Sequence, residues 1–207
     1  MTNREGRDGG SSIGPEDVLT FWLGPPGGSP LANATKWYTK NDAFDREIES
    51  RFGATLELAS RGDLDTWRGT ARERLALVIV LDQFSRNVYR GTPRAFAQDA
   101  RACSCAREAM ARGDERALGI IERTFLYMPL MHAEDVAAQR ECVAKFEGLR
   151  DEAPPELRDY IQNGLEYARR HAEIVERFGR FPHRNAILGR TSSAEESAFL
   201  EQPGSSF

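Results

Sequence analysis

The chain has 207 residues, of which 40% are hydrophobic and 29% charged, and its net charge at pH 7 is -4. This length and composition indicate one globular domain with a sizeable core. The acidic balance gives no reason to expect a nucleic-acid partner. No run approaches the roughly 18 apolar residues that a membrane span needs, and residues 1–15 lack the apolar segment of a secretory signal.

The cysteines predict reduced thiols. There are three of them, an odd number, which favours a cytoplasmic protein without disulfides. Cys103 and Cys105 form a C-x-C pair, which lacks the spacing of a zinc knuckle or of a redox C-x-x-C motif. We interpret them as small packing residues.

Helical periodicity and capping residues recur along the chain, and no segment shows strand alternation. The prediction is an all-α fold, with about eight helices in antiparallel hairpins. We expect a single domain at residues 14–202. Residues 1–13 are predicted to be a disordered lead, and residues 203–207 a C-terminal tail.

Proline, glycine and capping residues mark the first predicted helices. A helix begins at Pro15 and ends at the glycine- and proline-rich stretch 24–30. Asn41 caps the next, whose apolar side chains recur every four residues. A third helix is expected at 71–89, and a fourth from Pro93 to about residue 112.

The second half of the chain continues in the same way. One helix is predicted at 115–127, ending before Pro129, and another at 132–149. The last long helix begins at Pro155, where a pair of prolines precedes a run of regularly spaced apolar residues. A capping box of Ser192 with Glu195 then predicts a short final helix.

The helix predicted at 71–89 changes character along its length. Its first half is apolar on every side, which is typical of a buried helix. In its second half, Asp82, Arg86 and Arg90 line up at i, i+4 and i+8. The amides beside this row are Gln83 and Asn87. The polar arc continues the buried line, so it predicts groups that face a cavity or cleft. An Asp82–Arg86 pair that merely fixes the packing is an equal alternative.

Two of the three histidines stand in unusual surroundings. His132 lies shortly after Pro129, where one predicted helix gives way to the next. His183 lies in a loop rich in glycine and proline, which also carries Arg180, Arg184, Asn185 and Arg190. The third histidine, His171, looks like an ordinary helix residue.

The segments LDQFSRNVYRGTPRAFAQD, FLYMPLMHAED and FGRFPHRNAILGR contain these residues. They resemble the signature blocks of a bacterial family, domain-of-unknown-function family 924. The resemblance runs from about Val18 to Leu200 and implies an α-helical, tetratricopeptide-like fold. It implies no reaction, because none is assigned to the family. The family block more often has proline where this chain has Ser85, which argues against a serine nucleophile there.

We expect the three segments to surround one electropositive pocket. Guanidinium groups bind carboxylate or phosphate through paired hydrogen bonds, so an anionic small molecule is the predicted ligand. The predicted ligand-binding residues are Asp82, Gln83, Arg86, Asn87, Arg90, Arg180, Arg184, Asn185 and Arg190. His132 and His183 are predicted to transfer protons near neutral pH, with Asp82 or Glu134 setting their tautomer. The catalytic candidates are therefore His132, His183 and Glu134, as in a hydrolase or a lyase.

Other functions remain open. A tetratricopeptide-like scaffold would bind a peptide or protein partner in a concave groove, and fold likeness cannot decide between the two. A third reading is a buried ion-pair network that only fixes the packing. We predict no metal, because no H-E-x-x-H spacing is present and the arginines oppose a cation. We predict no cofactor, because the phosphate-binding glycine motifs are absent.

Overall fold

The structure, a computed structural model, describes residues 13–205, and within them it has helices and no strand. The prediction of an all-α single domain is confirmed. Most of the predicted lead and the last two residues of the predicted tail lie outside the described residues. No helix among residues 13–205 is long and apolar enough to pass through a membrane. The tetratricopeptide-like arrangement stays a prediction.

Ten α-helical segments are present in the described part of the chain. They are α1 (Pro15–Leu23), α2 (Ala34–Tyr38), α3 (Asp42–Arg61), α4 (Ala71–Ile79), α5 (Ser85–Val88), α6 (Asp99–Arg112), α7 (Ile120–His132), α8 (Val136–Glu152), α9 (Arg158–Phe178) and α10 (Ala194–Leu200). A π-helical segment, Val80–Phe84, joins α4 to α5. Single 3-10 turns precede or follow several of the others.

Local signals fix where the long helices begin and end. The side chain of Asn41 accepts hydrogen bonds from the backbone N–H groups of Ala43 and Phe44, at 3.0 and 3.1 Å, and so caps α3. Gly62 ends that helix with a left-handed backbone, φ 92°, which glycine adopts without strain. Thr70 and Glu73 form a capping box that begins α4.

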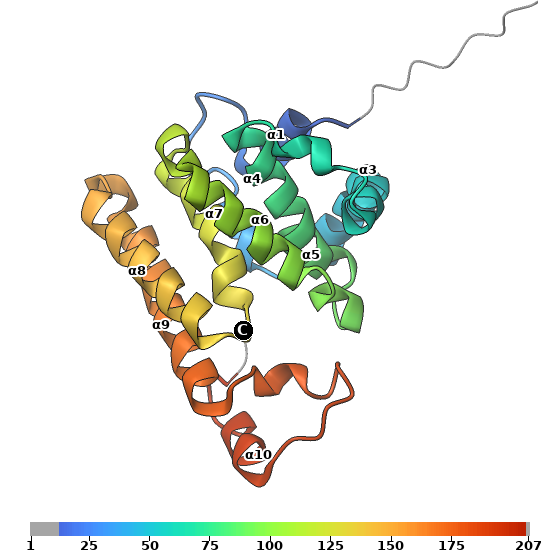
Figure 1. Ribbon diagram of the computed structural model, residues 1–207, viewed down its shortest axis with the longest axis vertical. Helices are drawn as coiled ribbons and strands as arrows, with labels where there is room; N and C mark the ends of the chain where they lie inside the picture. The colour runs from blue at the N-terminus through green and yellow to red at the C-terminus, as the bar shows by residue number, and fades with distance from the viewer. Residues whose placement is uncertain (1–12, 206–207) are drawn as a thin grey trace, which may run out of the picture.

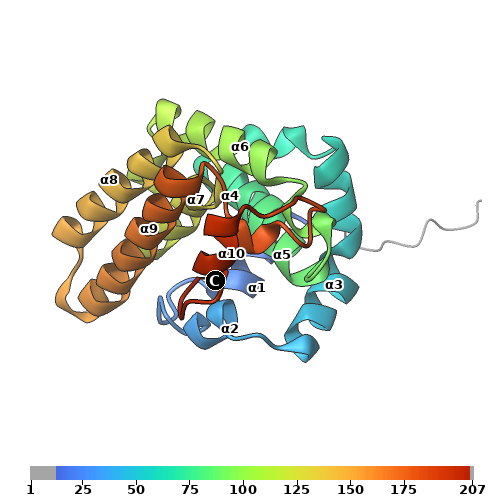
Figure 2. The same cartoon turned by 90° about the horizontal axis from the view of Figure 1, so that it is seen from below.

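The helices pack around the rod formed by α4, the π-helical segment and α5. Helix α4 contacts α1, α6 and α7, while α3 packs against the π-helical segment and α5. Helices α8 and α9 form an antiparallel hairpin along one side of the molecule, and both helices pack against α7 (Figure 1). After α9 the chain turns beneath the ends of the other helices and finishes with α10 (Figure 2). This turn brings the third sequence segment back to the first two.

Several helix boundaries differ from the sequence prediction, which does not include α2. Helix α7 runs through Pro129 to His132, because the residues around the proline are buried and only one backbone hydrogen bond is given up. After Pro93 the chain makes a 3-10 turn, so α6 begins only at Asp99. The last capping box uses Ser193 with Glu196, one residue later than expected.

Candidate functional site

The change from apolar to polar residues in the central rod falls within the π-helical segment Val80–Phe84. A π turn contains one more residue than an α turn, so it shifts the direction of the side chains that follow, and such turns are frequent at functional sites. All five of its residues are buried, and Asp82 has no exposed surface. The carboxylate of Asp82 is thereby enclosed among helices instead of facing solvent.

The Asp82 carboxylate accepts hydrogen bonds from three side chains. The donors are Nδ1 of His132 at 2.7 Å, Nη1 of Arg86 at 3.0 Å and Nε2 of Gln83 at 2.6 Å. Burial alone would raise the pKa of this carboxyl, but Arg86 and His132 outweigh the burial and hold the pKa well below its usual range. Asp82 is therefore ionised at neutral pH.

The partner of His132 determines its tautomer. Because an ionised carboxylate only accepts hydrogen bonds, Nδ1 of His132 carries the proton and Nε2 keeps its lone pair. Burial, followed by the nearby Arg86 charge, lowers the pKa of His132, so the ring is neutral at pH 7. A neutral, oriented imidazole with an available Nε2 is suited to accept a proton.

Asp99, the first residue of α6, joins the first and third sequence segments. Its carboxylate lies 2.9 Å from Arg86 Nη1 and accepts a hydrogen bond from Arg184 Nη1 at 3.1 Å. The Arg184 guanidinium also lies over the rings of Phe96 and Phe181, 4.6 and 4.4 Å from their centroids. Arg184 is only 5% exposed, and burial lowers its pKa to about 10. Its Nε is buried without a hydrogen-bond partner in the described structure.

Glu134 anchors the third segment to the end of α7. Its carboxylate accepts two hydrogen bonds from Arg190, at 2.6 and 2.8 Å, and a third from the backbone N–H of Phe181 at 2.8 Å. Burial raises its pKa, but the Arg190 hydrogen bonds and the Phe181 N–H lower it further, so Glu134 is ionised. These bonds commit the carboxylate to holding residues 181–190 in place.

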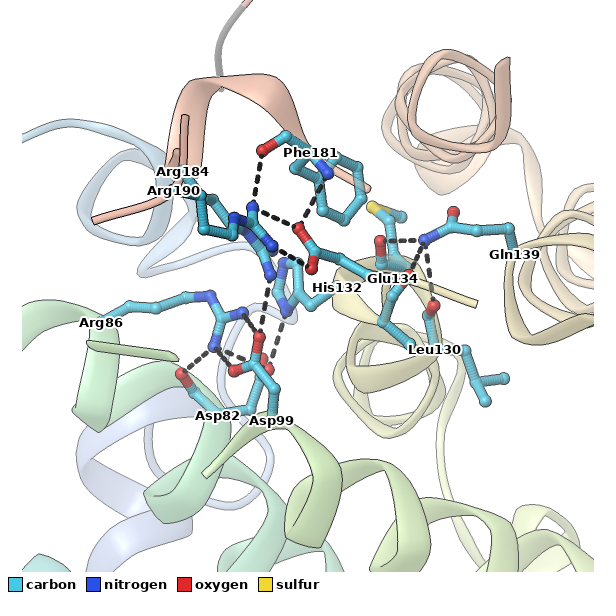
Figure 3. Close-up of polar contacts among 12 residues, drawn as sticks. Asp82, Arg86, Asp99, Leu130, His132, Glu134, Gln139, Phe181, Arg184 and Arg190 are labelled. Carbon is cyan, nitrogen blue, oxygen red and sulfur yellow. Dashed lines mark hydrogen bonds and ion pairs between the residues drawn. The ribbon is translucent and has the colours of Figure 1, made fainter. Parts of the chain in front are cut away.

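We call seven residues the buried polar cluster: Asp82, Arg86, Asp99, His132, Glu134, Arg184 and Arg190. Figure 3 shows the ring of His132 between the aspartates and the guanidinium groups of Arg184 and Arg190. The three arginines of the cluster face three carboxylates and His132 is neutral, so the formal charges of the cluster sum to zero. The cluster is balanced by charge, and not electropositive as the arginines alone predict.

The other predicted ligand-binding residues lie around or outside this cluster. Gln83 supports Asp82 from within the π-helical segment. Four others have partners elsewhere. Asn87 and Arg90 bind Asp45 on α3, Arg180 binds Glu196, and Asn185 donates to Ser192. The three segments therefore meet through part of their predicted residues.

His183 lies beside the cluster. Its ring centroid is 5.5 Å from that of Phe181, and burial, followed by the charge of Arg184, lowers its pKa to about 4. His171, which the sequence does not single out, is 6% exposed and its ring centroid lies 6.3 Å from that of His132. Burial, followed by His132, lowers the pKa of His171 to about 3. All three histidines are therefore neutral at pH 7.

Gln139 supports the cluster from α8. It is fully buried, and its Nε2 donates to the backbone oxygens of Met131, Ala133 and Leu130, at 2.6, 2.7 and 3.3 Å (Figure 3). The last turn of a helix leaves carbonyl oxygens without partners, and Gln139 supplies the missing donors. It thereby fixes the turn of α7 that presents His132.

Two cavities of about 540 and 580 Å³ lie elsewhere in the described structure. The first is lined by Glu115, Arg123 and Lys145 among others, and the second by Glu16, Arg72 and the loop 24–30. Neither is lined by a residue of the buried polar cluster. Among residues 13–205, no three His, Cys, Asp or Glu side chains gather closely enough to hold a metal ion.

Comparisons with known proteins agree with this fold. The family described as "Bacterial protein of unknown function (DUF924)" matches residues 18–204. A solved structure, the protein of unknown function ATU0120 from Agrobacterium tumefaciens, is 39% identical with a TM-score of 0.78. The match covers 90% of this chain and 96% of that one. Among curated proteins no match is found. The chain belongs to the DUF924 family of bacterial proteins of unknown function.

Proposed function

We propose that the chain binds a small anionic molecule through Arg184, and that His132, oriented by Asp82, exchanges a proton with it. The anionic group would be a carboxylate or a phosphate. The observation that carries the proposal is the state of Arg184, a buried cation with hydrogen-bond donors to spare, close to an oriented neutral histidine.

Arg184 has the properties of an anion-binding group. A guanidinium carries five N–H donors, and the hydrogen bond to Asp99 uses one of them. Its Nε has lost water and has gained no partner among the described residues. Each hydrogen bond to a charged group contributes about 1.5–3 kcal/mol. An anion that accepts hydrogen bonds from Nε and a neighbouring N–H would replace the hydrogen bonds to water that burial has removed.

The charge balance couples anion binding to protonation. The cluster is neutral when His132 is neutral, so a singly charged anion leaves a net charge of -1. Uptake of a proton at His132 Nε2 returns the site to neutrality. The Asp82–His132 pair follows the arrangement in which a carboxylate orients a histidine for proton transfer. Proton transfer to or from a bound anion is the chemistry of a hydrolase or a lyase.

The test is a thermal-unfolding screen with acetate, succinate, phosphate and a phosphate monoester. A ligand at a hundred times its dissociation constant stabilises the folded chain by ~2.7 kcal/mol. We expect at least one anion to raise the melting temperature of the wild type and not that of Arg184→Gln. Arg90→Gln is the matched control, because Arg90 pairs with Asp45 outside the cluster. The control variant should respond to the anion like the wild type.

Two outcomes would contradict the proposal. If no anion shifts the wild-type melting temperature, the cluster serves to fix the packing of the three segments. If the anion stabilises Arg184→Gln as well as the wild type, its site lies elsewhere. His132→Gln separates binding from proton transfer, because this variant should keep the anion and lose the proton uptake that calorimetry in two buffers measures.

A further inference from the structure

A row of aromatic side chains leads along α9 to the buried polar cluster. Tyr160, Tyr167 and His171 are spaced i, i+7 and i+11, which places them on one face of the helix. Nδ1–H of His171 donates to the backbone oxygen of Tyr167 at 2.8 Å, and its ring centroid lies 6.3 Å from that of His132. The row therefore ends beside the histidine of the proposed site.

Tyr38 joins this row from α2. Its hydroxyl oxygen lies 2.6 Å from that of Tyr160, and the ring centroids are 6.3 Å apart. We call Tyr38, Tyr160 and Tyr167 the tyrosine row.

Two rings of the tyrosine row, those of Tyr38 and Tyr167, present apolar surface to solvent, while the ring of Tyr160 is partly buried against the core. Only four large hydrophobic side chains are exposed among residues 13–205, and two of them are Tyr38, at 60%, and Tyr167, at 51%. The guanidinium of Arg170 lies 5.8 Å from the centroid of the Tyr167 ring, which adds a positive charge beside it. Tyrosines contribute a broad apolar contact and a polar tip at binding surfaces.

We propose that the bound anion is a carboxylate with an apolar chain, and that the tyrosine row holds the chain while Arg184 holds the carboxylate. This inference rests on the function proposed above and names its ligand class. The helical rise of 1.5 Å per residue places Tyr167 about 6 Å and Tyr160 about 16 Å along α9 from His171. A chain of several methylenes is therefore long enough to reach from His171, beside the cluster, to the exposed ring of Tyr167.

The experiment measures dissociation constants for acetate, butyrate, hexanoate and octanoate by calorimetry, with the full chain. Each methylene that becomes buried contributes ~0.8 kcal/mol, or about fourfold in affinity. We expect octanoate to bind the wild type at least tenfold more tightly than acetate. In a Tyr38→Ala, Tyr167→Ala double variant that ratio should fall below threefold, with the acetate constant unchanged.

Two controls keep the outcome clear. Leu58→Ala removes an exposed apolar side chain on α3 and should leave the whole series as in the wild type. Circular dichroism of the double variant checks that its helices are intact, as expected for exposed positions.

The failure of this inference differs from the failure of the proposed function. If acetate binds through Arg184 but affinity stays flat along the series, the apolar chain is wrong and the anion site stands. If affinity rises along the series equally in the double variant, the tyrosine row is not what holds the chain. If no carboxylate binds, both proposals fall.

Discussion

We predict that the isosteric substitution Glu134→Gln destabilises the segment 181–190 locally. Glu134→Gln keeps the shape of the side chain but removes its charge, and places an NH₂ group against the donors of Arg190. Three hydrogen bonds converge on this carboxylate, two from Arg190 and one from the Phe181 N–H. The Glu134 and Arg190 side chains are 25% and 24% exposed, so solvent weakens part of the interaction. We expect a loss of about 2–3 kcal/mol.

Hydrogen exchange measures this loss where it occurs. Because 1.4 kcal/mol corresponds to tenfold, the Phe181 amide should exchange roughly 30- to 150-fold faster in the variant. Amides in α4 should keep their protection, since the substitution leaves the core unchanged. Glu176→Gln is the control, because its pair with Arg140 is exposed and such pairs contribute under about 1 kcal/mol. Unchanged exchange at Phe181, or an equal loss of protection in α4, would refute the anchor.

Further predictions concern the buried ionisable groups. Asp82→Asn should lower the free energy of unfolding by about 2–4 kcal/mol in urea titrations and release the Nδ1–H tautomer of His132. Because His171 and His183 have pKa values of about 3 and 4 in the folded chain, the unfolded chain takes up protons first as the pH falls below 6.5. Stability should therefore drop between pH 6.5 and 4, by roughly 2 kcal/mol per histidine at pH 5, and no drop would contradict the burial of the rings. All three cysteines are buried, and burial raises the pKa of Cys105 to about 11, so thiol reagents should label the chain only as fast as it unfolds.

The sequence predicts the helices well because their signals are local. Asn41 caps α3 as expected, since the cap and its two recipient N–H groups lie within four residues. The prediction fails at Pro129, where burial of the surrounding residues outweighs a local helix-breaking preference. Packing of this kind depends on residues that are distant in sequence, so periodicity alone does not reveal it.

The sequence predicts only the part of the site that depends on local spacing. Asp82 and Arg86 meet as their i, i+4 spacing indicates. Arg90 turns away to Asp45, because α5 ends at Val88 and a helical wheel no longer describes the chain there. Asn87 also binds Asp45.

The residues that the sequence misses have distant partners. Asp99 stands in an alanine-rich stretch with no pattern of its own, and its partner Arg184 is 85 residues away. Gln139 acts through backbone oxygens of another helix, which no side-chain pattern predicts. In the structure, Gln139 stands out because its amide is fully buried near the start of α8.

The property that decides the role of His132 is its protonation state, which long-range ¹H–¹⁵N NMR of the imidazole reports. At pH 7 the wild type should show a neutral ring with the proton on Nδ1. Saturating acetate should shift the Nε2 resonance toward the protonated value, and should leave it unmoved in Arg184→Gln. A ring protonated on Nε2 in the free chain, or an Nε2 resonance that shifts with none of the anions tested, would contradict anion-coupled proton uptake at His132.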